Sequence, residues 1–72
     1  MKILNIQVGQ RYRTRAGSII LITKVNDYPM NKDLYSFIGV DVYSKFIHSY
    51  TSKGHFLHSK EWNQKDLIEQ IN

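Results

Sequence analysis

Residues 8–25 read VGQRYRTRAGSIILITKV and decide the fold, because they join an alternating segment to a run of apolar residues. In residues 8–16 every second side chain of an extended chain falls on the same face. Tyr12 and Thr14 then point inward, and three arginines point outward: Arg11, Arg13 and Arg15. Residues 19–25 are apolar on both sides, which is typical either of a strand covered on both faces or of a central strand of a small closed barrel.

The chain beyond residue 25 continues as short segments rich in β-branched and aromatic residues, separated by turn residues. We expect a third strand in residues 34–43, with a bulge or bend at Gly39. Residues 46–51 and 55–58 flank Ser52-Lys53-Gly54, which is typical of a three-residue hairpin loop with a left-handed glycine. That register predicts three cross-strand pairs: Thr51 with His55, Tyr50 with Phe56 and His48 with His58.

The pattern of residues 63–71 predicts the one helix. Asn63 can cap the first turn, and Asp66 stands at the third helical position, as in a capping box. Trp62 and Leu67 suit a hydrophobic staple across the start of the helix. We therefore expect a single domain, residues 1–72, with a β-barrel over residues 6–58 that this short helix plugs or braces.

Composition limits the class of protein. Leu, Ile, Val and Phe make up 21 of the 72 residues, which favours a folded domain, but a chain this short has little interior for a catalytic pocket. Because there is no cysteine, disulfides and thiolate zinc sites are excluded, and a cytoplasmic setting is favoured. The start of the chain lacks the apolar core of a signal peptide, and the longest apolar run, residues 19–22, is too short to cross a bilayer. We expect no membrane partner.

The net charge of +4 is unevenly distributed along the chain. Residues 1–36 contain six basic and two acidic residues, whereas residues 37–72 contain four of each. Such a field favours an anionic partner, which is either a nucleic acid or an acidic protein surface.

The arginines of the first strand are the main candidates for partner binding. Arg11, Arg13 and Arg15 span about 13 Å of an extended chain and could engage successive phosphates or a row of carboxylates. The alternative is a solvated face that protects a strand from pairing with another chain. Among the aromatic residues we expect Tyr28 and Tyr43 to be exposed and available to a partner, and most of the others to fill the core.

No pattern in the chain indicates catalysis. No two of its six carboxylates fall within a recognisable acid/base or metal motif, and its four glycines do not form a phosphate-binding loop. His48 and His58 would supply two ligands to a metal, whereas catalytic zinc uses three protein ligands and structural zinc four. We expect a non-enzymatic protein with no cofactor and no metal site.

Four segments carry a resemblance to a protein family: residues 9–17, residues 35–39, residues 50–54 and Asp66-Leu67. They resemble small uncharacterised proteins of bacteriophages and prophages, which carry motifs of the form Y-x-T-R-x-G, Y-P-F-x-G and Y-T-x-x-G. Ser36 stands where those proteins usually have proline. The resemblance implies an SH3-like barrel of about five strands, in a phage context where short proteins bind host machinery to block or redirect it.

Three functions follow as expectations. The first is a phage-type inhibitor or modulator that docks on a host protein, in counter-defence or host takeover. The second is direct nucleic-acid binding, in which the arginines neutralise phosphates and an exposed tyrosine stacks on a base. The third is a homo-oligomer joined through an unpaired edge strand.

Overall fold

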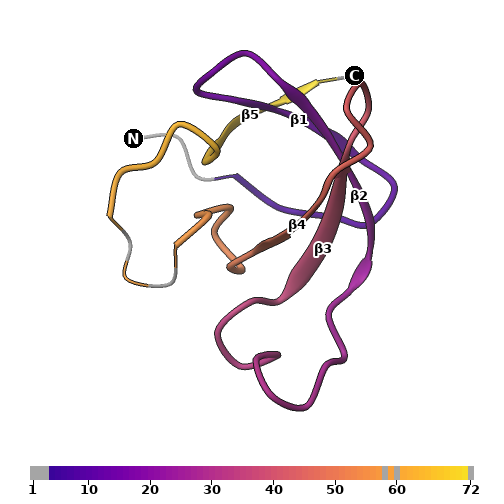
Figure 1. Cartoon of the computed structure of the whole chain (residues 1–72), viewed down its shortest axis with the longest axis vertical. Helices are drawn as coiled ribbons and strands as arrows, with labels where there is room; N and C mark the ends of the chain where they lie inside the picture. The colour runs from indigo at the N-terminus through magenta and orange to yellow at the C-terminus, as the bar shows by residue number, and fades with distance from the viewer. Residues whose placement is uncertain (1–3, 58, 60, 72) are drawn as a thin grey trace.

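The computed structural model describes residues 4–57, 59 and 61–71, and in this part of the chain five strands form one antiparallel sheet (Figure 1). The strands are β1 (Arg11–Thr14), β2 (Ile19–Val25), β3 (Phe37–Asp41), β4 (Ile47–Tyr50) and β5 (Leu67–Ile71). Their order in the sheet is β4-β3-β2-β1-β5, so β5 returns to pair with β1, and β4 and β5 are the two edges. The predicted mainly β fold with about five strands is confirmed.

The core lies on the inner face of the curled sheet. Tyr12, Ile20 and Ile22 are at most 1% exposed and come from β1 and β2. Thr14 is 2% exposed, so the predicted inward direction of Tyr12 and Thr14 is confirmed. The core is completed by residues from both edge strands and from the start of the chain: Tyr50, Leu67 and Ile6.

The segment before β1 covers this core. Ile6 is 7% exposed, and Leu4 packs against the same cluster. The Tyr12 hydroxyl holds the segment in place, because it accepts a hydrogen bond from the Gln7 N–H at 2.8 Å and donates one to the Asn5 carbonyl at 2.9 Å. A buried tyrosine with two backbone partners therefore fixes the piece of chain that closes the inner face.

The Tyr12→Phe variant tests this anchor. We expect its free energy of unfolding to fall by about 1–2 kcal/mol, because two backbone groups lose their partner while the ring packing remains. The measurement is the midpoint of urea unfolding, at an unchanged dependence of the free energy of unfolding on urea concentration. The control is Tyr43→Phe, whose ring is exposed. A midpoint equal to that of the wild type would show that the two hydrogen bonds do not hold the segment.

The predicted C-terminal helix is wrong, because residues 67–71 form β5. The described residues contain no helix there, and β5 pairs with β1 through contacts such as Arg13 with Glu69. The predicted capping-box bonds nevertheless form: the Asn63 side chain accepts from the Lys65 N–H at 2.8 Å, and the Asp66 side chain accepts from the Asn63 N–H at 3.0 Å. These two hydrogen bonds close a turn and not the first turn of a helix. The residues that follow then pair with the edge of β1 that β2 leaves open.

The predicted barrel is not closed. Among the described residues β4 and β5 do not pair with each other. The start of β5 contacts the loop after β4 through one hydrogen bond, which the Leu67 N–H donates to the Gly54 carbonyl at 2.9 Å. A seam therefore remains between the two edges of the sheet. The inner face of the sheet is covered by the segment before β1, where a helix was expected to cover it.

The hairpin predicted around residues 52–54 forms only in part. Gly54 has φ +86°, and the Thr51 N–H donates to the His55 carbonyl at 3.0 Å, as the predicted loop requires. Residues 55–57 are not a strand, although the rings of Tyr50 and Phe56 meet edge to face at 6.1 Å. The predicted pairing of His48 with His58 lies outside the described residues.

The irregularity predicted at Gly39 of β3 is found instead in the neighbouring strand β2. The register between β2 and β3 shifts between Ile22 and Lys24, opposite Gly39 and Ile38. Gly39 itself is needed for close packing, since a Cβ there would lie 2.5 Å from the Ile20 Cγ2 atom.

Candidate protein-binding surface

The outer face of the sheet carries a line of side chains across all five strands, and four of the five are aliphatic. The pairing register places Ile71 opposite Arg11, Arg11 opposite Leu21, Leu21 opposite Val40 and Val40 opposite Ile47. This line contains one residue from each of the five strands. We call its four aliphatic members, Leu21, Val40, Ile47 and Ile71, the apolar row.

The apolar row is accessible to solvent. Ile47 on the edge strand β4 is 72% exposed, and the other three members are partly exposed. Ile19 and Ile38, which are also partly exposed, extend the row on the same face through the alternation of β2 and β3. Leu21, Val40 and Ile47 are neighbours across β2, β3 and β4, and adjoining exposed aliphatic side chains are typical of a surface that another molecule covers.

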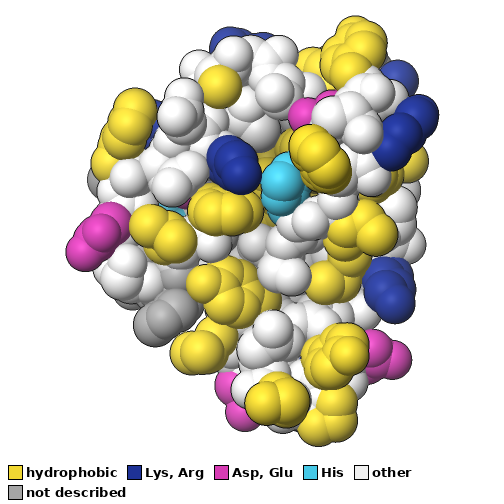
Figure 2. All heavy atoms as spheres, viewed as in Figure 1, with side chains coloured by type: hydrophobic (Ala, Val, Ile, Leu, Met, Phe, Trp, Pro, Cys, Tyr) yellow, Lys and Arg dark blue, Asp and Glu magenta, His cyan; other side chains and the backbone are white. Residues whose placement is uncertain are grey.

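Tyr28 adjoins one end of this face. The segment between β2 and β3 folds back at the lower end of the molecule, where Figure 2 shows a group of apolar side chains. There Tyr28, Ile38 and Ile47 line a common pocket of about 370 Å³, together with Lys24. Tyr28 is 66% exposed, so a partner on the apolar row could also contact its ring.

The segment that presents Tyr28 is held by Asn26, which is 5% exposed. The Asn26 side chain accepts from the Tyr28 N–H at 3.1 Å and donates to the Tyr35 carbonyl at 2.7 Å and the Asn31 side chain at 2.8 Å. A buried amide with three local partners gives this segment a defined shape. Met30, at 90% exposed, projects from it.

Tyr43 is 79% exposed and lies in the turn between β3 and β4, at the other end of β3 from Tyr28. Asp41 shapes this turn, since its Oδ1 atom accepts from the Tyr43 N–H at 2.8 Å and the Ser44 N–H at 3.1 Å. These two bonds hold the pKa of Asp41 below its ordinary value. The predicted exposure of Tyr28 and Tyr43 is confirmed, but the two rings flank the face at opposite ends.

The three arginines do not form one uniform basic row. Arg11 is exposed and stands within the line of the apolar row. Arg13 forms an ion pair with Glu69 on β5, and that carboxylate raises the pKa of the guanidinium. Arg15 lies beyond β1, where its guanidinium is 3.5 Å from the Asp66 Oδ2 atom. Two of the three predicted contact residues therefore already face a carboxylate of the same chain.

The aromatic prediction is partly wrong. Tyr12 and Tyr50 are fully buried as expected, but Phe46 is 69% exposed and Trp62 is 70% exposed. Trp62 has the Arg15 guanidinium 5.6 Å from its ring centroid instead of a staple contact with a helix. Because no helix begins after Asn63, the predicted apolar contact of Trp62 has no place to form.

Sequence reasoning missed the apolar row. The two-sided apolar character of residues 19–25 was a signal, because one side of a strand that covers a single core must face outward. The row itself depends on the register of five strands, which alternation within one strand does not specify. The described residues contain no group of three or more potential metal-ligating side chains placed to hold a metal ion.

Comparison of the chain with protein-family models, with curated proteins and with solved structures gave no match. In the part of the chain that the structure describes, no helix has the length and apolar character of a membrane span.

Proposed function

We propose that the chain is a non-enzymatic binding protein that docks the outer face of its sheet on another protein. The observation that carries this proposal is the apolar row, which has members on four of the five strands of a partly exposed face. Protein–protein contacts are centred on apolar and aromatic side chains with a polar rim. Arg11 and Lys24 provide positive charge on this face, and Asp27 adds a negative charge in the pocket beside Lys24. The complementary partner surface therefore has an apolar centre with charged groups of both signs around it.

The biological role in this proposal is that of a phage-type protein that inhibits or modulates a host protein in the cytoplasm of the host cell. The phage or prophage setting is supported by the sequence motifs alone. An SH3-like arrangement belongs to the same proposal. It is supported by the meander of β1 to β4, by the return of β5 to β1, and by the bond between Gly54 and Leu67 that draws the two edges together.

A double variant of the outer face, Tyr28→Ala with Ile47→Ser, tests the proposal. Both side chains are more than half exposed, so the fold should tolerate the changes. We expect the tagged variant to retain at least tenfold less of its protein partner from a host lysate than the wild type does, because apolar contact area is lost. The measurement is quantitative mass spectrometry of the retained proteins.

The matched control is Val8→Ser with Trp62→Ala, which removes two exposed apolar side chains elsewhere on the molecule. It should retain the same partner as the wild type. Equal retention by the outer-face variant, or equal losses by both double variants, would contradict the proposal. The single variant Arg11→Ser should weaken retention modestly and more at low salt, since its charge lies beside the row.

The alternative is a small basic nucleic-acid-binding protein. Arg11, Lys24 and the exposed Tyr28 are the groups that would serve it, whereas Arg13 and Arg15 already face carboxylates. Fluorescence anisotropy with labelled single- and double-stranded oligonucleotides distinguishes the two functions. Binding that falls linearly on a log–log salt plot and that Arg11→Ser weakens would favour the nucleic-acid function. Light scattering at increasing protein concentration tests self-association through the edge strands.

A further inference from the structure

Strand β4 is an edge of the sheet, and every second residue of it directs its backbone groups away from β3. The Asp41 N–H donates to the Phe46 carbonyl at 2.9 Å, so Asp41 and, by alternation, Gly39 direct their backbone groups towards β4. Gly39 pairs with His48, which therefore bonds to β3. The residues on either side of His48 point their N–H and carbonyl groups outward, and these residues are Ile47 and Ser49.

No described backbone group bonds to these outward groups. The loop after β4 begins to cover the edge, since the Thr51 N–H donates to the His55 carbonyl at 3.0 Å. Residues 55–57 do not continue this pairing as a strand, and among the described residues Ser49 and Leu57 form no backbone hydrogen bond with each other. Ile47 and Ser49 therefore offer two donors and two acceptors at the spacing of a β-ladder.

Strand β4 also lacks the features that keep an edge strand from pairing with another chain. Its four residues include no proline and no charged side chain, and it pairs with β3 without a bulge. Burial lowers the pKa of His48, so the strand is uncharged at pH 7. The other edge is different, because on β5 the Leu67 N–H already donates to the loop after β4, and Glu69 forms an ion pair with Arg13.

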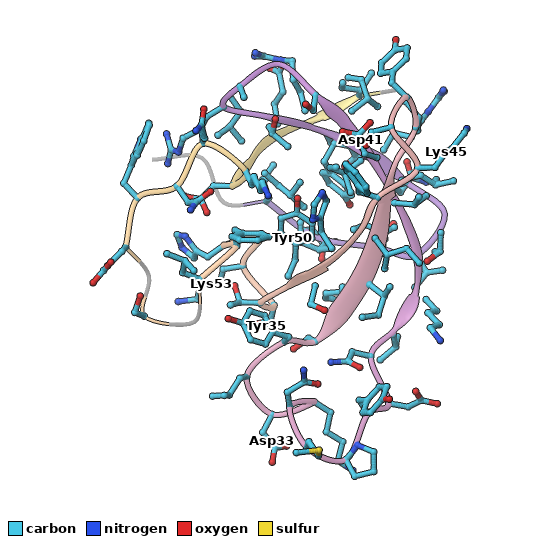
Figure 3. The ribbon with its side chains drawn as sticks, viewed as in Figure 1. Asp33, Tyr35, Asp41, Lys45, Tyr50 and Lys53 are labelled. Atoms are coloured by element: carbon cyan, nitrogen blue, oxygen red, sulfur yellow. The ribbon has the colours of Figure 1, made fainter. Side chains whose placement is uncertain are left out.

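A pocket of about 240 Å³ lies along the edge on the side of His48. Besides β4 itself, Tyr35, Phe56 and Leu57 line it, so its walls are largely apolar. Figure 3 shows Tyr35 where the chain enters β3. The volume is enough for one apolar side chain that a partner inserts beside the strand.

The pocket of about 370 Å³ beside Tyr28 and Ile38 lies on the opposite side of β4, on the outer face. Ile47 and Ser49 line both pockets. An extended segment that pairs with β4 directs successive side chains to opposite faces, and therefore alternately to the two pockets. Backbone bonds to an open edge combined with pockets for alternate side chains are the features of peptide binding by strand addition.

We propose that β4 binds an extended apolar segment of a partner protein as a sixth strand, with backbone bonds to Ile47 and Ser49. This inference rests on the proposed binding function, because it defines the conformation that the partner takes beside the outer face. The partner segment fits better than a second copy of the chain. A second β4 would present its own His48 to the inner pocket, but that ring already packs edge to face on Tyr50 at 6.4 Å and on Phe56 at 5.7 Å.

The test uses seven-residue peptides selected on the wild-type protein from a synthetic random library, with the ¹⁵N-labelled protein as the readout. In the free protein the amide hydrogens of His48 and Tyr50 should exchange slowly and those of Ile47 and Ser49 fast, because only the first two lie in the ladder. We expect the selected peptides to carry apolar side chains at adjoining positions and to slow the exchange of the Ile47 and Ser49 amides by about tenfold or more.

Two N-methylated forms of the best peptide show whether its backbone pairs with β4. Each form is methylated at every second residue, so one form loses the N–H groups that face β4 and the other loses those that face solvent. The first should bind about tenfold more weakly or worse than the unmodified peptide, and the second about equally. Equal binding of the two forms would overturn the proposal, and this comparison needs no variant of the protein.

The variant Ser49→Pro removes one outward donor, which an edge strand tolerates, and Ser49→Ala is its matched control. With the fold verified by circular dichroism, only Ser49→Pro should lose affinity for the peptide. If partner retention and peptide binding both fall in the double variant Tyr28→Ala with Ile47→Ser but not in Ser49→Pro, the outer-face function stands and the added strand is overturned. A library that yields no peptide, or Ile47 and Ser49 amides that are already protected in the free protein, would also overturn it.

Discussion

The Asp66→Ala variant is expected to lose about 3–5 kcal/mol of its free energy of unfolding, because the substitution breaks a buried charged network. The Asp66 carboxylate accepts from the Phe56 N–H at 2.8 Å and the Asn63 N–H at 3.0 Å, and it faces Arg15 at 3.5 Å. Asp66 is 2% exposed, so water cannot freely replace these contacts. For a domain of this size that loss approaches the whole stability, and the circular dichroism of the variant should be largely that of an unfolded chain.

The matched control for this prediction is Asp33→Ala, which removes an exposed carboxylate from the segment between β2 and β3. It should change the free energy of unfolding by no more than about 0.5 kcal/mol. Asp66→Asn, which keeps one acceptor oxygen, should fall between the two. If Asp66→Ala unfolded at the same urea concentration as Asp33→Ala, the carboxylate would not hold together the turn before β5 and the loop after β4.

The second large effect is expected for Gly39→Ala, at about 2–3 kcal/mol of destabilisation. A Cβ at this position would lie 2.5 Å from the Ile20 Cγ2 atom and 3.2 Å from the Leu21 carbonyl oxygen. Ile20 is 1% exposed and belongs to the buried cluster, so a shift of its side chain disturbs the packing of the core. The inner face should therefore be disturbed at its centre, as measured by the urea midpoint.

A double-mutant cycle separates this clash from a general loss of strand stability. Ile20→Ala alone leaves a cavity and should cost about 2–4 kcal/mol. In the double variant the Cγ2 atom is absent, so the combined loss should be smaller than the sum of the single losses by at least about 1 kcal/mol. Strict additivity would show that Gly39 is required for a reason other than its contact with Ile20.

The strand content and the inner face could be predicted from the sequence because they depend on local pattern. Alternation in residues 8–16 correctly placed Tyr12 and Thr14 in the core, since a strand directs successive side chains to opposite faces. The glycine turn at Gly54 was likewise a matter of local backbone conformation.

The end of the chain was assigned wrongly because its local pattern fits two structures. Leu67, Ile68 and Ile71 have helical spacing, yet the nine residues of the predicted helix, 63–71, are too few for a stable isolated helix. Residues 67–71 instead form hydrogen bonds with β1 in the sheet. That pairing joins residues more than fifty positions apart, such as Arg13 and Glu69. Tertiary contacts of this kind override local propensity.

The candidate surface could be predicted only in fragments. Tyr28, Tyr43 and Arg11 were found from the sequence, because exposed aromatic and basic residues are visible without a register. The apolar row was not, since Leu21, Val40, Ile47 and Ile71 come together only when five strands are aligned.

Site-specific photo-crosslinking in a host lysate shows whether the outer face of the sheet binds a protein. A photoreactive phenylalanine analogue replaces Tyr28 in one sample, Ile47 in a second, and in a third Trp62, which is similarly exposed but lies in the segment before β5. We expect one adduct of the same mass from Tyr28 and Ile47, resistant to nuclease, with none from Trp62. An adduct that only Trp62 forms, or adducts that nuclease removes, would contradict this expectation.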